Sequence, residues 1–232
     1  MMEWLRQIRY MGLYAAYSTD GTDATLYLLC IFAGCVIAYL LGSINSAILL
    51  VRLKYHDDIR AHGSGNAGMT NVLRTYGKGA GIATLGFDML KAVLSVCIAM
   101  LLAGQNGGYA AMVFCMLGHM FPIYFHFKGG KGVAVAAASI LCLEPLVFLI
   151  VILVFAAVVA MTKYVSLGSI MAALLYPLLL NRIYFLLHQA DPGIFVSGFS
   201  LLAALLVVIM HKDNIRRLLA GKESKLNLRR KP

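Results

Sequence analysis

Charged residues are scarce in this sequence of 232 residues. Only 13% of its residues are Asp, Glu, Lys or Arg, while 61% are hydrophobic. Soluble domains carry roughly a quarter charged residues, so this composition excludes an ordinary soluble protein and indicates an integral membrane protein. The long apolar runs also lack the alternation of polar and apolar residues that a membrane β-barrel needs. We therefore predict an all-α membrane bundle.

Several patterns of catalytic and metal-binding residues are missing too. No Gly-x-Ser-x-Gly sequence occurs, which argues against a serine hydrolase, and no histidine is followed five residues later by Asp. The five cysteines sit in apolar stretches without a Cys-x-x-Cys pair, and no cluster of His, Cys and carboxylates has metal spacing. We expect no metal and no cofactor.

Apolar runs predict seven membrane helices, at about 25–52, 79–103, 109–125, 132–143, 145–161, 166–187 and 194–211. The fourth is too short to cross a hydrocarbon core of about 30 Å and is interpreted as a half-helix. A further short helix is predicted from about Gly68 to Tyr76. Residues 1–24 form an N-terminal extension without a cleavable signal peptide, either an interfacial helix or a frayed tail.

The cations predict the orientation of this transmembrane domain (25–211). With the N-terminus outside and seven crossings, sixteen of the twenty Lys and Arg residues fall on the inner side, and the three outer loops carry none. Both glycine-rich loops and a basic tail (212–232) are then cytoplasmic. The net charge of +10 follows from orientation and attraction to anionic lipid, so no nucleic-acid partner is expected.

The first of two glycine-rich loops runs from Arg60 to Arg74. Glycines allow tight turns, and the interleaved hydroxyl and amide side chains can donate to an anion at the start of the short helix. Arg74 lies on that helix and can cover the same anion. The alternative is that Ser64 or Asn66 merely caps the helix.

The second glycine-rich loop is Lys128-Gly129-Gly130-Lys131-Gly132, directly before the short fourth helix. A lysine near a helix N-terminus is electrostatically unfavourable unless an anion is held there. A simple interfacial turn with two snorkelling lysines is the alternative. The sequence lacks the spacing of a Walker P-loop.

A third polar element, His211 to Arg217, stands where the last helix leaves the membrane. His211 and Asn214 share a helix face, and His211 is a candidate proton acceptor. The alternative is a basic anchor with an incidental histidine. Asp88 and Lys91 are interpreted as a structural ion pair within the second helix, and His119, His126 and Lys163 as interfacial.

Together these elements resemble the bacterial acyl-phosphate-dependent glycerol-3-phosphate acyltransferases, the PlsY type. The resemblance runs from Gly42-Ser43-Ile44 to Lys225 and includes all three polar elements, Asp88-Met89-Leu90-Lys91 and Gly221-Lys222-Glu223. Two departures are a longer N-terminus and Asn45, where Pro is common in the family.

The resemblance implies transfer of a fatty acyl chain from acyl phosphate to the sn-1 hydroxyl of glycerol 3-phosphate, giving lysophosphatidic acid and phosphate at the cytoplasmic face of a bacterial inner membrane. An activated donor needs no covalent enzyme nucleophile. Either His211 or a substrate phosphate oxygen takes the hydroxyl proton. The implied catalytic residues are Ser64, Asn66, Arg74, Lys131, His211 and Asn214, and the implied substrate-binding residues are Arg60, Gly63, Gly65, Thr70, Asn71, Lys128, Gly129, Gly130 and Gly132.

Two other classes of protein have polar loops beside membrane helices. A transporter for a phosphorylated metabolite needs its polar groups near the membrane midplane, whereas all three clusters here are predicted at one face. A scaffold that binds anionic lipid predicts cations without the Ser, Asn and Thr residues interleaved at 64–74.

Overall fold

A computed structural model describes residues 11–13 and 24–226, which form helices and connecting loops without a strand. The chain divides into two units, residues 1–143 and 144–232. The predicted all-α membrane fold is confirmed. Residues 1–24, predicted to be either an interfacial helix or a frayed tail, lie almost entirely outside the described residues, and the predicted three-part division of the chain stays a prediction.

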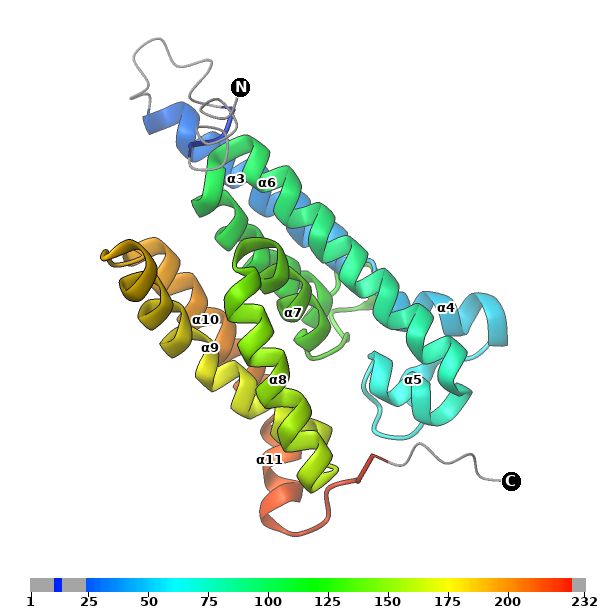
Figure 1. Cartoon of the computed structure of the whole chain (residues 1–232). Helices are drawn as coiled ribbons and strands as arrows, with labels where there is room; N and C mark the ends of the chain where they lie inside the picture. Colours follow the sequence, from blue (N-terminus) through cyan, green and yellow to red (C-terminus); the bar gives the residue numbers. More distant parts are fainter. Residues whose placement is uncertain (1–10, 14–23, 227–232) are drawn as a thin grey trace. The chain divides into compact units, whose positions relative to one another are not determined.

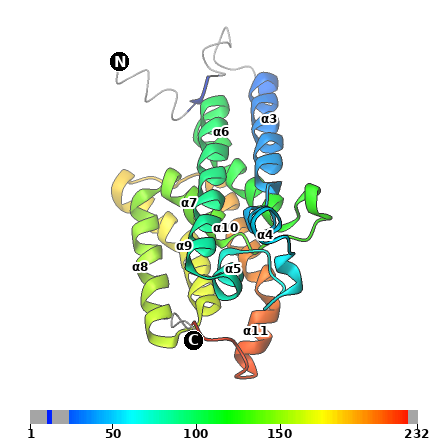
Figure 2. The ribbon, with the colours of Figure 1, turned by 90° about the vertical axis from the view of Figure 1, so that its right-hand side faces the viewer.

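The first unit is built around two long apolar elements, α3 (Ala24–Ser43) and α6 (Lys78–Met120). They run side by side in both ribbon views (Figures 1 and 2). Small residues allow the close approach: a Cβ on Gly42 would collide with the Cys115 carbonyl, and one on Gly118 with the Tyr39 carbonyl. Helices in lipid associate through such contacts between backbones.

The chain reverses within α6, at Ala103 and Gly104, where the backbone leaves helical geometry. Gly107 then lies against the carbonyl of Ala99, although a continuous helix would hold these two residues far apart. Figure 1 shows the ribbon of α6 turning back on itself. The break fits the predicted boundary between the helices at 79–103 and 109–125. The rest of this unit comprises α4 (Ser46–Tyr55), η1 (Ile59–Ala61), α5 (Met69–Tyr76), η2 (Ile123–Phe125) and α7 (Val133–Leu143).

The predicted continuous helix over 25–52 is wrong in one respect, because it breaks at Ile44 and Asn45. The Asn45 side chain accepts a hydrogen bond from the Ile48 amide at 3.0 Å and so caps α4. A capping asparagine stabilises the start of a new helix. The predicted short helices at Gly68–Tyr76 and 132–143 correspond to α5 and α7.

The second unit contains α8 (Pro145–Thr162), α9 (Val165–His188), α10 (Ile194–Met210) and α11 (Lys212–Leu219). α9 packs against both α8 and α10. The segment after α11 returns to the α8–α9 turn, where the Leu226 amide donates to the Lys163 carbonyl at 2.7 Å. The last predicted membrane helix ends at about residue 211, and beyond it the sequence predicted only that His211 and Asn214 share a helix face; α11 extends to Leu219.

Among the described residues, four helical stretches are long and apolar enough to cross a membrane, or five if the bent α10–α11 pair counts as one span. The stretch containing α6 counts once although it covers two predicted helices, and α7 is short. The predicted count of seven membrane helices and the orientation of the termini therefore stay predictions.

Candidate active site

The first glycine loop is organised by one buried side chain, Asn71 of α5, which is 2% exposed. Its Oδ1 accepts from the Ser64 amide at 3.1 Å, and its Nδ2 lies within 2.9–3.3 Å of the carbonyls of Ile59, His62 and Asn66. Gly63, with φ of +58°, lies so close that a Cβ would collide with the Asn71 oxygen. This geometry suits a side chain that shapes the loop, and direct contact of Asn71 with substrate stays a prediction.

Arg60 joins this loop to the second one. Its guanidinium forms a fork on Asp58, with Nε–Oδ1 at 3.0 Å and Nη2–Oδ2 at 2.6 Å, while Nη1 donates to the carbonyls of Phe125 at 3.1 Å and Lys128 at 3.4 Å. Hydrogen bonds from Arg60 hold the pKa of Asp58 well below its usual range, and Asp58 in turn raises the pKa of Arg60. Arg60 is thus committed to protein contacts.

A second acidic residue, Asp57, lies just before the first glycine loop and contacts two of its neighbouring side chains, Tyr76 and His62. Its Oδ2 accepts from Tyr76 Oη at 2.6 Å and lies 2.8 Å from His62 Nε2. The hydrogen bond from Tyr76 is the main reason that the pKa of Asp57 is lowered, and it raises the pKa of Tyr76 to about 12. Tyr76 also stacks on Tyr55 at a centroid distance of 4.4 Å. α4, α5 and the loop between them therefore form one connected structure.

The second glycine loop packs tightly against the end of α6. The Gly129 amide donates to the Met120 carbonyl at 3.1 Å, and the Gly130 amide donates to the His119 carbonyl at 3.0 Å. A Cβ on Gly130 would collide with the His119 ring and would come within 2.7 Å of the Ala67 carbonyl of the first loop. These glycines are required for close packing, and their amides are used within the protein.

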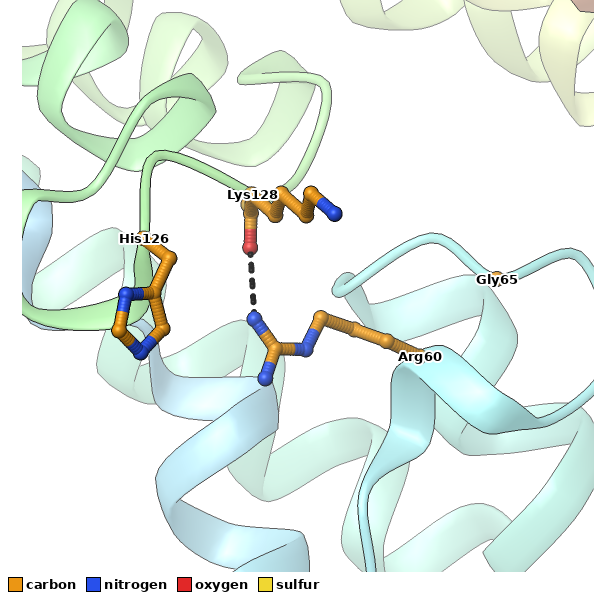
Figure 3. Close-up of a pocket in the computed structure, with 5 residues that line it drawn as sticks. Arg60, Gly65, His126 and Lys128 are labelled. Atoms are coloured by element: carbon orange, nitrogen blue, oxygen red, sulfur yellow. Dashed lines mark hydrogen bonds between the residues drawn. The ribbon is translucent and has the colours of Figure 1, made fainter.

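A shallow pocket of about 610 Å³ lies where the two loops meet, lined by Arg60, Gly65, His126, Lys128 and Gly129. Figure 3 shows Arg60 reaching the Lys128 carbonyl while the Lys128 side chain extends away from that contact. Four of these residues were predicted to bind substrate. His126, which was interpreted as interfacial, is exposed and lines the pocket.

Other predicted site residues of this unit surround the same loops. Ser64 and Arg74 are exposed, whereas Asn66, Thr70 and Lys131 are half-buried. α5 starts at Gly68 without a side-chain cap, and α7 starts after Gly132, whose carbonyl accepts from Ala136. Both helix starts offer main-chain amides, which favour anions.

In the second unit, His211 and Asn214 lie one turn apart, where α10 gives way to α11, and both are buried. The Nδ1 atom of His211 is 2.7 Å from the Val207 carbonyl. A carbonyl only accepts, so Nδ1 carries a proton, and Nε2 is the acceptor nitrogen of the neutral ring. This tautomer is the one that a proton acceptor at Nε2 requires.

Glu223, which sequence reasoning did not include among the site residues, fixes the Asn214 amide. Its Oε1 accepts from Asn214 Nδ2 at 2.7 Å and from Ser166 Oγ at 2.8 Å, and its Oε2 accepts from Arg217 Nε at 2.8 Å. Burial alone would raise the pKa of Glu223, but the hydrogen bonds from Arg217, Asn214 and Ser166 outweigh burial and lower it. Glu223 lies beyond the end of α11 and nine residues after Asn214, so no helical spacing rule predicts this contact.

Comparison with known proteins identifies the family. The family model described as glycerol-3-phosphate acyltransferase matches residues 32–221. The chain belongs to the glycerol-3-phosphate acyltransferase family. Glycerol-3-phosphate acyltransferases of Thermoanaerobacter pseudethanolicus and Trichlorobacter lovleyi are 43% and 46% identical to it, over 82% and 81% of this chain and 93% of each relative.

Solved structures agree with this family assignment. The chain is similar to crystal structures of PlsY, an integral membrane glycerol 3-phosphate acyltransferase, in its glycerol 3-phosphate form (TM-score 0.77, 35% identity) and its lysophosphatidic acid form (TM-score 0.74, 34% identity). Each comparison covers 85% of this chain and 96% of the PlsY chain. The resemblance to the PlsY family seen in the sequence is therefore confirmed, and the chain is an acyltransferase of glycerol 3-phosphate in a membrane.

Proposed function

We propose that this chain transfers a fatty acyl group from acyl phosphate to the sn-1 hydroxyl of glycerol 3-phosphate, releasing phosphate and 1-acylglycerol 3-phosphate. The observation that carries the proposal is the similarity, over 96% of the PlsY chain, to PlsY crystal forms with glycerol 3-phosphate and lysophosphatidic acid. These two compounds are the acceptor and the product of the proposed reaction. The fatty acyl chain reaches the protein from the lipid phase.

The proposed chemistry is a direct displacement at the acyl carbonyl. The sn-1 oxygen forms the new ester bond, the bond from the carbonyl carbon to the phosphate oxygen breaks, and phosphate leaves with the bonding electrons. The hydroxyl proton goes either to His211 Nε2 or to a phosphate oxygen of a substrate. Catalysis then consists of alignment and stabilisation of charge, which needs no covalent enzyme intermediate.

The anionic groups of the substrates have distinct candidate donors. Since the Gly129 and Gly130 amides donate within the protein, we assign phosphate binding at the second loop to Lys128, Lys131 and the start of α7. At the first loop we assign it to Ser64, Asn66, Thr70 and Arg74, with the uncapped start of α5. Main-chain amides at helix starts and lysine or arginine side chains are the usual partners of phosphate.

His211 and Asn214 are proposed to orient the glycerol part of the acceptor. Glu223 accepts from the Asn214 NH₂ group, so the other end of that amide is a carbonyl oxygen, which is an acceptor suited to a substrate hydroxyl. The tautomer of His211 likewise makes Nε2 an acceptor. Both groups therefore have the polarity that binding a hydroxyl requires.

We further propose seven crossings of a bacterial inner membrane, with the N-terminus outside and the polar loops at the cytoplasmic face. The support is the strong excess of Lys and Arg in the segments assigned to the inside. Single cysteines placed in the outer loops near 105–106 and 189–191 should react with an impermeant thiol reagent in intact cells. Labelling of residue 128 under the same conditions would contradict this orientation.

The reaction is tested with purified protein in lipid vesicles supplied with acyl phosphate and glycerol 3-phosphate. The expected products are lysophosphatidic acid with the acyl chain at sn-1 and an equal amount of phosphate. A parallel reaction with acyl-CoA tests the donor. Arg74→Gln is expected to lose activity, while Arg216→Gln, at an exposed cation on α11, serves as the charge-matched control and should keep it. If acyl-CoA gives product and acyl phosphate does not, the proposed donor is wrong. If neither donor gives product, the proposed acyltransferase function is wrong.

A further inference from the structure

A buried group of charged and polar side chains inside the first unit is not part of the pocket lining. Lys91 Nζ is 2.9 Å from Asp88 Oδ1 and 3.0 Å from His119 Nδ1. All three residues are at most 6% exposed. The sequence predicted the Asp88–Lys91 ion pair and interpreted His119 as interfacial, but it did not indicate that the His119 ring is buried beside that pair. An apolar set of similar volume would cost less to bury, so the cluster calls for a further explanation.

One arm of this cluster reaches the first glycine loop. Lys91 Nζ donates to the carbonyls of Gly42 at 3.0 Å and Ile44 at 2.8 Å, where α3 ends and before α4 begins. The next residue, Asn45, is fully buried, caps α4 and donates from Nδ2 to the Ala67 carbonyl at 3.3 Å. Lys91 thereby fixes the main chain at the α3–α4 break, and Asn45, at the same break, bonds to the first glycine loop.

The other arm reaches the second glycine loop through His119. An ammonium group only donates, so His119 Nδ1 accepts from Lys91, and the ring proton is on Nε2. The Nε2 side of the ring lies directly against Gly130, whose amide donates to the His119 carbonyl. Gly130 also lies against the Ala67 carbonyl, so the two arms converge where the loops touch.

We infer that Lys91, Asp88 and His119 are positioning residues that set the two glycine loops relative to each other. Lys91 bonds to the α3–α4 break, which contacts the first loop, and to His119, which contacts the second loop. A single buried ammonium group therefore positions both loops. The inference about the loops rests on geometry alone, while its consequence for catalysis rests on the proposed function. If the loops bind the phosphates of two substrates, their separation decides the alignment of the reacting atoms.

Amide hydrogen exchange tests the inference without substrate. The double variant Asp88→Asn/Lys91→Met leaves no unpaired buried charge. We expect amide exchange in segments 59–71 and 126–132 to be at least about fivefold faster than in the unchanged protein. Thr84→Val, one turn earlier on α6, is the matched control and should leave both segments unchanged, because the Thr84 hydroxyl donates to the Ala80 carbonyl of the same helix. Faster exchange in α6 alone, or no change, would overturn the inference.

Single variants separate the two arms. Asn45→Ala is expected to speed amide exchange in 59–71 and His119→Leu in 126–132, each with little change in the other segment. In the vesicle assay the double variant should raise KM for both substrates and lower kcat, and Thr84→Val should not. Unchanged kinetic constants in a folded double variant would show that the cluster is purely structural. If the unchanged protein makes no product, the proposed function fails, and the exchange experiment still decides whether the cluster positions the loops.

Discussion

Replacing Asn71 by Ala should open the first glycine loop without unfolding the membrane helices. The carboxamide makes all its described contacts with the main chain of residues 59–66, and it is the only side chain described here that bonds to four points of that loop. Alanine removes the oxygen and the NH₂ group together. It is also a strong helix former, so α5 itself should be retained.

The size of the effect follows from the environment of each hydrogen bond. Three of the four are partly exposed, so water can replace Asn71 there, and each contributes about 0.5 kcal/mol. The bond to the Ile59 carbonyl is buried and contributes about 1.5 kcal/mol, at the upper end of the range for one hydrogen bond, although the His62 amide still donates to that carbonyl. A total of about 3 kcal/mol corresponds to a roughly hundredfold larger population of the open loop.

Native-state proteolysis measures this population, because trypsin cuts after Arg60 only when the loop opens. The rate of cleavage at this bond, followed by mass spectrometry, should rise roughly a hundredfold for Asn71→Ala. Thr75→Ala, at an exposed position of the same helix, is the control and should be cut at the normal rate. If Asn71→Ala is cut no faster than the control while KM for a substrate rises, then Asn71 is a ligand of that substrate and not the organiser of the loop.

Three further predictions concern proton positions. His211→Gln should lower kcat by about 10²–10⁴ and remove the decrease in rate toward acidic pH if the imidazole accepts the hydroxyl proton; a small decrease with an unchanged pH profile would assign that proton to a substrate phosphate. Because the pKa of Glu223 is lowered in the folded state, its stabilisation is present above the unfolded pKa and is lost as pH falls through the folded value. Thermal unfolding of Glu223→Gln should therefore be less sensitive to acid than that of the unchanged protein. For Tyr76, the difference in phenolate absorbance between the unchanged protein and Tyr76→Phe should titrate near pH 12, whereas a midpoint near 10 would show that the bond to Asp57 is absent.

The fold could be predicted from the sequence to the extent that hydrophobicity determines it. Apolar runs located the helices to within a few residues, and glycines with polar neighbours located the loops between them. The break at Asn45 was missed although Ser43, Asn45 and Ser46 interrupt the apolar run there, because the hydrophobic residues on both sides were interpreted as one helix. The helix break depends on one side chain, Asn45, which caps α4 and also donates to the Ala67 carbonyl. The second bond is a tertiary contact that the local sequence does not encode.

The sequence indicated which residues belong to the candidate site, but not which partner each side chain binds in the folded protein. Sequence reasoning singled out Arg60 and Asn71 because they are polar and lie in a glycine-rich loop, yet both are bonded to the protein's own main chain. It interpreted His119 as interfacial and did not connect this ring with Lys91. Partners distant in sequence, such as Lys91 for His119 and Glu223 for Asn214, depend on tertiary packing that no local pattern encodes.

The internal bonding of these loops changes the role expected of their glycines. The Gly129 and Gly130 amides donate to carbonyls of α6, so a phosphate cannot use them unless the loop detaches. Ligand donors then come from lysine ammonium groups and from the starts of α5 and α7, which are already oriented before substrate arrives. A Gly130→Ala substitution would accordingly act by displacing Lys131 and the start of α7 rather than by removing a donor. Rigid loops of this kind suit a reaction in which alignment of two bound phosphates supplies most of the catalysis.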